Sequence, residues 1–430
     1  MSRILNMARP PIERGTAEIT DGTVEVMPLG LDITTRIAAI DEARLRRGRL
    51  DRLRTELAKR DFAGALLADP MNIRYATGTR NMAVWTMHSP GRYAFVATDG
   101  PVVLFEFGAT RHVSRNSPVV DQLRTSTPWF YFLCGPRVDE KATVWAEEVA
   151  SLLERHGGRN RRLAIDRCEP WGAARLIDRG IELFDVQEAI EQARVVKTPE
   201  ELACLRLSMD VCDIAIGRIR AALRPGLTEN QVWSILHETN IAHDGEWIEC
   251  RLLASGERTN PWFQECSNRV IEAGDIVGFD TDMVGPFGYL ADVSRTLVCP
   301  GRKPSPEQRK LYDLAQDQVT FNAGLLRPGL TFREFAERCW PVPEAFANNR
   351  YMMMVHGVGM VDEYPSVAYV QDFAEWGYDG MFEEDMVVSV ESYIGEGGAK
   401  EGVKLEQQLL ITATGAVPMS RSPFIDAIEV

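Results

Sequence analysis

The sequence predicts an α+β protein of two domains, and three observations lead to this prediction. At 430 residues the chain is longer than the roughly 250 to 300 residues at which a single hydrophobic core stops growing. Strand and helix signals alternate up to about residue 195, as is typical of an α/β domain. Beyond that point a long capped helix begins, and two strand pairs that carry acidic residues follow.

The composition indicates a folded, water-soluble protein. Hydrophobic residues make up 45% of the chain, charged residues 26%, and the formal net charge is −14. This negative charge argues against nucleic acid or an anionic membrane as a partner, because both would be repelled. No apolar run approaches the ~18 residues of a membrane span, and the first residues lack the apolar core of a secretory signal. The eight cysteines show no metal-ligand spacing, so reduced thiols and a cytoplasmic location are expected.

Three regions are expected along the chain. Residues 1–30 mix Pro, Gly and charges without a period and predict an N-terminal arm. Residues 31–196 predict an α/β domain that opens with a helical pattern over 33–59. The boundary is expected before Thr198, Pro199 and Glu201, which resemble a helix N-cap, N1 and N3. Residues 197–430 form the second domain.

The second domain is predicted to mix capped helices with strands. A capped helix is expected in GLTENQVWSILHETN, and further helices at about 305–325 and 331–347. Strands are expected around 249–256, 274–284, 289–298, 386–394 and 403–412.

The first acidic strand pair lies in GFDTDMVGPFGYLADVSRT, residues 278–296. Asp280 and Asp282 are two positions apart, so on a strand their side chains would leave from one face. A turn at GPFG that pairs the strands about Phe287 would set Asp282 opposite Asp292. Like charges on cross-strand neighbours ~5 Å apart are destabilising, so a positive group is expected between them.

The second pair repeats this arrangement about a hundred residues later. The segments MVVSVESYI and VKLEQQLLIT flank EGGAKEG, and pairing about Gly398 would set Glu391 opposite Glu406. The apolar neighbours of both glutamates predict a buried sheet, where five carboxylates need cations or raise one another's pKa.

A pair of divalent metal ions would resolve this conflict. His356 in MMMVHGVGM offers a nitrogen ligand, whereas the other five histidines have no comparable setting. The alternative is an Asp-rich turn in water, but the aspartates flank the turn instead of lying in it. Carboxylates with one imidazole suit manganese, iron, cobalt or zinc.

These residues together resemble the pita-bread metallohydrolases of peptidase family M24. The resemblance rests on the ordered positions Asp280, Asp282, Asp292 in DVSRT, His356 in HGVG, Glu391, and Glu406 in KLEQQLLIT. NIRYATGT and VVKTPEE resemble the N-terminal domain and interdomain junction of the creatinase and prolidase branch. The resemblance implies a C-terminal pita-bread catalytic domain behind a creatinase/prolidase-type N-terminal domain.

The chain also departs from the family's peptidases. Met360 stands where they carry a second histidine, no histidine precedes the first aspartates, and Glu391-Ser392-Tyr393 replaces their EPG motif. These differences argue against peptide hydrolysis.

The tracts GEWIECRLLASGERTNPWFQE, HGVGMVDE and NMAVW resemble those of dimethylsulfoniopropionate lyases that share this fold. The resemblance implies β-elimination to dimethyl sulfide and acrylate at two metal ions, with iron favoured. It also implies that Asp362 is the base, that Tyr351 supports it, and that the protein is a homodimer.

A sulfonium substrate needs aromatic faces, as quaternary ammonium ligands do. Trp85, Trp262, Phe263 and Tyr351 are the candidates for binding this small zwitterion, although core packing is the commoner role of a tryptophan. Two alternatives stay open: an Xaa-Pro dipeptidase or aminopeptidase P-like hydrolase, and a non-catalytic binding protein on the same fold. Intact ligands argue against the last.

Overall fold

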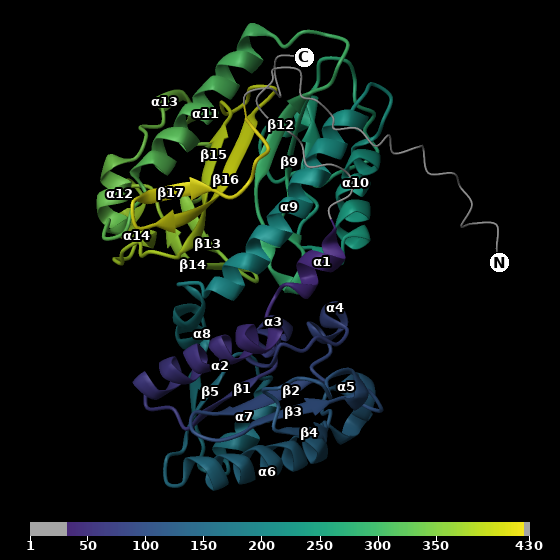
Figure 1. The fold of residues 1–430 in the computed structure, drawn as a ribbon, viewed down its shortest axis with the longest axis vertical. Helices are drawn as coiled ribbons and strands as arrows, with labels where there is room; N and C mark the ends of the chain where they lie inside the picture. The colour runs from purple at the N-terminus through teal and green to yellow at the C-terminus, as the bar shows by residue number, and fades with distance from the viewer. Residues whose placement is uncertain (1–31, 425–430) are drawn as a thin grey trace, which may run out of the picture. The chain divides into compact units, whose positions relative to one another are not determined.

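The computed structural model describes residues 32–424, so the expected arm at residues 1–30 lies outside the described part. Two compact units form, one from residues 41–200 and one from residues 201–424 together with helix α1 (Ile33–Ala38) (Figure 1). The sequence predicted one helix over 33–59 in the first domain. The structure breaks it, because the Asp41 side chain accepts a hydrogen bond from the Arg44 N–H and starts a new helix, α2 (Glu42–Lys59). Helix α1 groups with the second unit, where Arg36 forms an ion pair with Asp210.

The unit of residues 41–200 contains a mixed six-stranded sheet with helices on both faces (Figure 1). Helices α2 and α8 pack on each other, as do α6 and α7, and α6 also packs on β2. Its core gathers Phe95, Phe105, Trp145, Val149 and Leu153 from β2, β3 and α6. The strands, in sheet order, are β4 (Gln122–Thr125), β3 (Val102–Glu106), β2 (Tyr93–Ala97), β1 (Gly64–Leu67), β5 (Arg162–Ile165) and β6 (Glu182–Asp185). The helices are α3 (Pro70–Thr77), α4 (Ala83–Thr86), α5 (Tyr131–Cys134), α6 (Val138–Gly157), α7 (Pro170–Ile177) and α8 (Gln187–Arg194).

The unit of residues 201–424 is built from three sheets and flanking helices. Helix α11 packs against β15 and β16, and β16 in turn contacts β12 and β9 (Figure 1). The five-stranded sheet runs β14 (Asp362–Val367), β13 (Val355–Val358), β15 (Val387–Ile394), β16 (Val403–Thr412), β17 (Gly415–Pro418). The three-stranded sheets are β12 (Ser294–Val298), β9 (Ile276–Asp280), β8 (Leu253–Ser255), and β11 (Leu290–Ala291), β10 (Met283–Val284), β7 (Trp247–Ile248).

The helices of this unit begin at sequence-encoded caps. Helix α9 (Pro199–Ala222) starts at the predicted proline, and Thr228 and Ser305 form capping boxes at α10 (Glu229–Ala242) and α11 (Pro306–Leu325). The predicted helix over 331–347 is wrong in its middle. It divides into α12 (Phe332–Arg338) and α13 (Glu344–Ala347), because Pro341 and Pro343 interrupt the backbone hydrogen bonds. A short helix, α14 (Phe373–Trp376), follows β14.

Both predicted strand registers are confirmed. Glu391 pairs with Glu406 across β15 and β16. In the first hairpin, Met283 pairs with Ala291 and Asp280 with Ser294, which is the register centred on Phe287. Among residues 32–424, no helix has the length and apolar character needed to cross a membrane.

Candidate metal centre

The structure brings the six predicted ligands together from both hairpins and from β13. Potential ligand atoms form three overlapping groups, within each of which the atoms lie no more than 4.8 Å apart. The groups are Asp280 with Asp282 and Asp292, His356 with Glu391 and Glu406, and Asp292 with His356 and Asp362. All six predicted ligands except Asp282 are buried. The two hairpins therefore enclose one shared cluster of donor atoms.

The local geometry of the first hairpin differs from the prediction. Strand β9 ends at Asp280, and Asp282 has a left-handed backbone with φ of 32°. The intervening Thr281 causes the break, because its hydroxyl donates to the Ala291 carbonyl and accepts from the Val293 N–H. Asp280 and Asp282 thus reach the cluster across a strand interruption and not from one regular strand face.

His356 lies at the centre of the carboxylates. Its Nε2 is 3.5 Å from Asp292 Oδ2, from Glu391 Oε1 and from Glu406 Oε1. Its Nδ1 lies 3.2 Å from the Gly357 carbonyl oxygen, which can only accept a hydrogen bond. Nδ1 can donate to this carbonyl, which leaves Nε2 facing the carboxylate cluster, the orientation usual for a metal-binding histidine.

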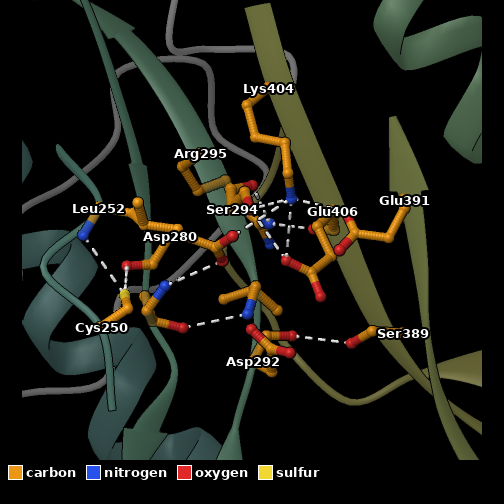
Figure 2. A network of polar contacts seen from close by, with 12 residues as sticks. Cys250, Leu252, Asp280, Asp292, Ser294, Arg295, Ser389, Glu391, Lys404 and Glu406 are labelled. Atoms are coloured by element: carbon orange, nitrogen blue, oxygen red, sulfur yellow. Dashed lines mark hydrogen bonds and ion pairs between the residues drawn. The ribbon is translucent and has the colours of Figure 1, made fainter. Parts of the chain in front are cut away.

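Lys404 is a buried cation at the edge of this cluster, and its side chain has no accessible surface. Figure 2 shows its ammonium group reaching between the glutamates of the second hairpin. Lys404 Nζ lies 2.5 Å from Glu391 Oε2, 3.3 Å from Asp280 Oδ2 and 3.4 Å from Glu406 Oε2. It also donates to Ser294 Oγ at 2.7 Å. One lysine therefore contacts carboxylates from both hairpins.

Burial and mutual charge shift the pKa values of these groups in opposite directions. Burial raises the pKa of Asp292 well above its usual range, and burial raises that of Asp282 to about 6. Burial alone would also raise the pKa of Glu406, but Lys404 and His356 hold it below its ordinary value. Burial opposes the charge of Lys404, yet Asp280 and the glutamates keep its pKa well above the usual range. The neighbouring carboxylates therefore favour the protonated, positively charged form of Lys404.

Contacts behind the ligands lock the two hairpins to each other (Figure 2). The Asp292 N–H donates to Gln408 Oε1 at 2.9 Å, and the Ser389 hydroxyl donates to the Asp292 carbonyl at 3.0 Å. Ser294 Oγ donates to Glu406 Oε2 at 2.8 Å, and the fully buried Arg295 donates to the Glu406 carbonyl at 2.7 Å. The backbone contacts hold the two hairpins together, and the Ser294 hydroxyl orients the Glu406 carboxylate.

The donor set fits divalent metal ions. Asp292 Oδ1 and Glu406 Oε1 are buried and have no hydrogen-bond partner among the described residues. Buried carboxylate oxygens are nearly always satisfied, so these two oxygens need a cation. Five carboxylates and one imidazole match the preferences of manganese, iron, cobalt or zinc.

Asp362, the predicted base, opens β14 on the solvent side of His356. Its Oδ1 is 3.5 Å from His356 Nδ1, and 61% of its side chain is accessible. Burial of part of the carboxyl group raises the pKa of Asp362, although the attraction of His356 opposes this rise. Asp362 is thus both adjacent to the cluster and reachable by a small molecule.

The aromatic candidates divide into accessible and packed rings. Phe263 is 53% exposed and stacks on Tyr351 with ring centroids 5.4 Å apart. Tyr351 also has the Lys404 ammonium 4.5 Å from its ring centroid, so the ring already holds a cation. Trp262 is only 6% exposed and packs near Tyr393. Phe263 is therefore the most accessible aromatic side chain of these three.

Trp85 lies in the unit of residues 41–200, whereas the other aromatic candidates belong to the unit of residues 201–424. It packs against Phe107 with ring centroids 4.9 Å apart and against Phe130 with centroids 6.4 Å apart. Its proposed role in substrate binding stays a prediction.

Sequence reasoning missed Lys404, although a signal was present. Lys404, Glu406 and Gln408 occupy every second position of β16, and residues two apart on a strand share a face. Three polar side chains on one face of a buried strand indicate a functional face and not a core face. The roles of Ser294, Ser389 and Arg295 depend on contacts between hairpins, which spacing along the chain cannot reveal.

Comparisons with known proteins agree with this architecture. The model of Metallopeptidase family M24 matches residues 203–413, and that of the Creatinase/Prolidase N-terminal domain matches residues 49–196. Dimethylsulfoniopropionate lyase DddP of Roseovarius nubinhibens is 38% identical over 400 residues, which cover 92% of this chain and 90% of that protein. DddP of Roseobacter denitrificans is 36% identical over 443 residues, which cover 100% of this chain and 99% of that protein.

Solved structures support the same fold at lower identity. The Xaa-Pro dipeptidase from Bacillus anthracis superimposes with a TM-score of 0.69 and 20% identity, covering 88% of this chain and 98% of that chain. The chain therefore belongs to metallopeptidase family M24, with a creatinase/prolidase-type N-terminal domain and full-length relatives among the DddP proteins.

Proposed function

We propose that this protein is a metal-dependent carbon–sulfur lyase that cleaves dimethylsulfoniopropionate to dimethyl sulfide and acrylate. The observation that carries the proposal is the likeness to two DddP lyases over nearly the whole chain. The site supports it, because a buried lysine, a cluster of potential metal ligands and an accessible carboxylate lie together.

The reaction needs a base next to a reachable α-carbon. Asp362 would take the proton from the carbon beside the substrate carboxylate, and the C–H electron pair would form the new carbon–carbon double bond. The C–S bond breaks with its electron pair on sulfur, so the sulfonium leaves as neutral dimethyl sulfide. Acrylate and a protonated Asp362 remain, and the proton passes to solvent because the side chain is accessible.

Two divalent ions, for which iron is favoured by the resemblance, would be held by Asp280, Asp282, Asp292, His356, Glu391 and Glu406. When bound, they supply positive charge beside the substrate carboxylate, where negative charge accumulates in the transition state. Tyr351, whose pKa burial raises, would stay protonated and can donate a hydrogen bond at the same place. Phe263 offers an exposed ring for the sulfonium group.

The accessible position of Asp362 distinguishes it from a ligand. Asp292 and Glu406 are enclosed, whereas Asp362, which shares one donor group with Asp292 and His356, can meet the substrate. Asp362→Asn should therefore retain the metal content of the wild type and lose about 10²- to 10⁴-fold in kcat.

The test is headspace measurement of dimethyl sulfide, with acrylate quantified in solution, using metal-loaded protein. The proposal predicts equimolar dimethyl sulfide and acrylate from wild type and a strong loss in Asp362→Asn. Release of no dimethyl sulfide above the Asp362→Asn background would refute it. A parallel assay with Xaa-Pro dipeptides should give no cleavage. Cleavage of these dipeptides would favour the alternative that the protein is an Xaa-Pro dipeptidase or a related hydrolase.

We further propose a homodimer and a cytoplasmic location. Tyr131, Phe132 and Leu133 present an apolar surface on α5, with 71%, 77% and 51% of each residue exposed. Such a patch fits a self-association surface. Analytical ultracentrifugation tests it, because Phe132→Asp should shift a dimer toward monomer.

A further inference from the structure

Three chain segments that meet beside the candidate metal centre share one hydrogen-bond network. The first segment carries Trp262 and Phe263, the second is the turn between β15 and β16, and the third leads into Tyr351. We call the rings of Trp262, Phe263 and Tyr351 the aromatic wall. We infer that Asn260, together with Tyr393 and Asn349, positions the aromatic wall for substrate binding. This inference rests on the proposed function of the site.

Asn260 uses the whole hydrogen-bonding capacity of its amide. Its Nδ2 donates to the Glu396 carbonyl at 2.8 Å and to the Ala399 carbonyl at 2.9 Å. Its Oδ1 accepts from Asn349 Nδ2 at 2.8 Å and from the Tyr393 hydroxyl at 2.8 Å. Two carbonyl oxygens can face only the NH₂ side, so the orientation of the amide is fixed by its surroundings.

The two partner side chains extend the network. Asn349 donates its second proton to the Gly395 carbonyl at 3.0 Å. The Tyr393 hydroxyl also lies 2.9 Å from the Thr259 carbonyl, so its single proton is shared between this oxygen and Asn260 Oδ1. The turn between β15 and β16 is therefore hydrogen-bonded both to the segment that carries Trp262 and Phe263 and to the segment that leads into Tyr351.

The backbone around Tyr393 is shaped to admit its phenol. A Cβ at Gly395 would lie 2.6 Å from the hydroxyl oxygen, and a Cβ at Gly402 would lie 2.3 Å from it. Only 2% of Tyr393 is exposed, and its ring lies 6.1 Å from that of Trp262. The phenol therefore fills a fitted space directly behind the wall.

The wall also contacts the ligand cluster through its cation. Lys404 Nζ lies 4.5 Å from the ring centroid of Tyr351 and 5.9 Å from that of Trp262. Phe263 has a left-handed backbone with φ of 68° and stacks on Tyr351. Phe263 follows Asn260 by three residues, so the hydrogen bonds that fix Asn260 limit where this exposed ring can lie. Asn260, Asn349 and Tyr393 belong to none of the three ligand groups, so replacing them should leave metal binding intact.

The variants Tyr393→Phe and Asn260→Ala test the inference, with Tyr312→Phe as the matched control. Tyr312 is another buried tyrosine, and its hydroxyl donates to the Phe424 carbonyl. We expect Tyr393→Phe to raise KM for dimethylsulfoniopropionate ~3- to 10-fold and Asn260→Ala to raise it more, because one hydrogen bond contributes within that range and Asn260→Ala removes several. Metal content should match the wild type, and Tyr312→Phe should leave KM unchanged.

Hydrogen–deuterium exchange provides a readout that does not need turnover. Peptides that cover 259–263 and 349–353 should exchange faster in both variants than in wild type or Tyr312→Phe. Unchanged exchange there, or a KM equal to that of the control, would overturn the inference. If wild type released no dimethyl sulfide, the proposed function would fail while the exchange result would still decide the role of the network.

Discussion

Replacing Lys404 by methionine removes the buried cation while keeping a side chain of similar length. Lys404 has no accessible surface, and its ammonium contacts Glu391, Asp280 and Glu406 within 3.4 Å. Removing one partner of a buried ion pair costs about 3 to 5 kcal/mol, because the remaining charges stay buried without compensation. We expect metal-free Lys404→Met to lose stability of this order.

This loss is large enough to measure by thermal unfolding. For a unit of about 150 to 250 residues, 1 kcal/mol corresponds to ~2 to 4 °C, so the transition of residues 201–424 should fall by at least about 6 °C. Lys400→Met is the matched control. Lys400 lies on the turn of the same hairpin and pairs with Glu257 on the surface, where ion pairs contribute little.

Bound metal ions should reduce the difference in thermal stability between wild type and Lys404→Met. Divalent cations replace part of the missing positive charge, so metal-loaded Lys404→Met should regain much of the lost stability. Calorimetry of metal-free and metal-loaded protein measures both values. If metal-free Lys404→Met unfolded within 2 °C of the wild type, the lysine would not compensate the carboxylates and the reasoning would be wrong.

Three further predictions concern the ligands and the other unit. Asp292→Ala should lose bound metal and activity together, and full metal occupancy measured by mass spectrometry would contradict its role as a ligand. Ser294→Ala removes the hydroxyl between Glu406 and Lys404 and should weaken metal affinity about 10- to 100-fold; an unchanged Kd from a chelator competition would exclude this role. Burial raises the pKa of Asp166 to about 6, so the folded chain holds this proton more tightly than the unfolded chain, whose aspartate has a pKa of about 4. Stability of residues 41–200 should therefore fall as pH rises between about 4 and 6, and Asp166→Ala should flatten this slope in Tm measurements; parallel curves would contradict it.

The sequence predicted the main elements of the site because their signals are local. Glu391 and Glu406 lie on strands of clear apolar character around a glycine-rich turn, so their pairing follows from chain geometry. Phe287 marks the centre of the other hairpin for the same reason. Caps at Thr228 and Ser305 likewise depend on residues three positions apart.

What the sequence did not predict depends on contacts between distant segments. The break at Thr281 arises because its hydroxyl bonds to Ala291 and Val293 on the opposite strand. Helix α1 groups with the second unit through its ion pair with Asp210, although its sequence is continuous with α2. Lys404 is explained only by carboxylates from two hairpins that converge in space.

Anomalous diffraction from metal-loaded crystals tests the central claim most directly, since the claim is that two hairpins enclose divalent ions. We predict two peaks of anomalous density between the hairpins, bounded by oxygens of Asp280, Asp282, Asp292, Glu391 and Glu406 and by His356 Nε2. Active crystals without such density between the hairpins would contradict the account.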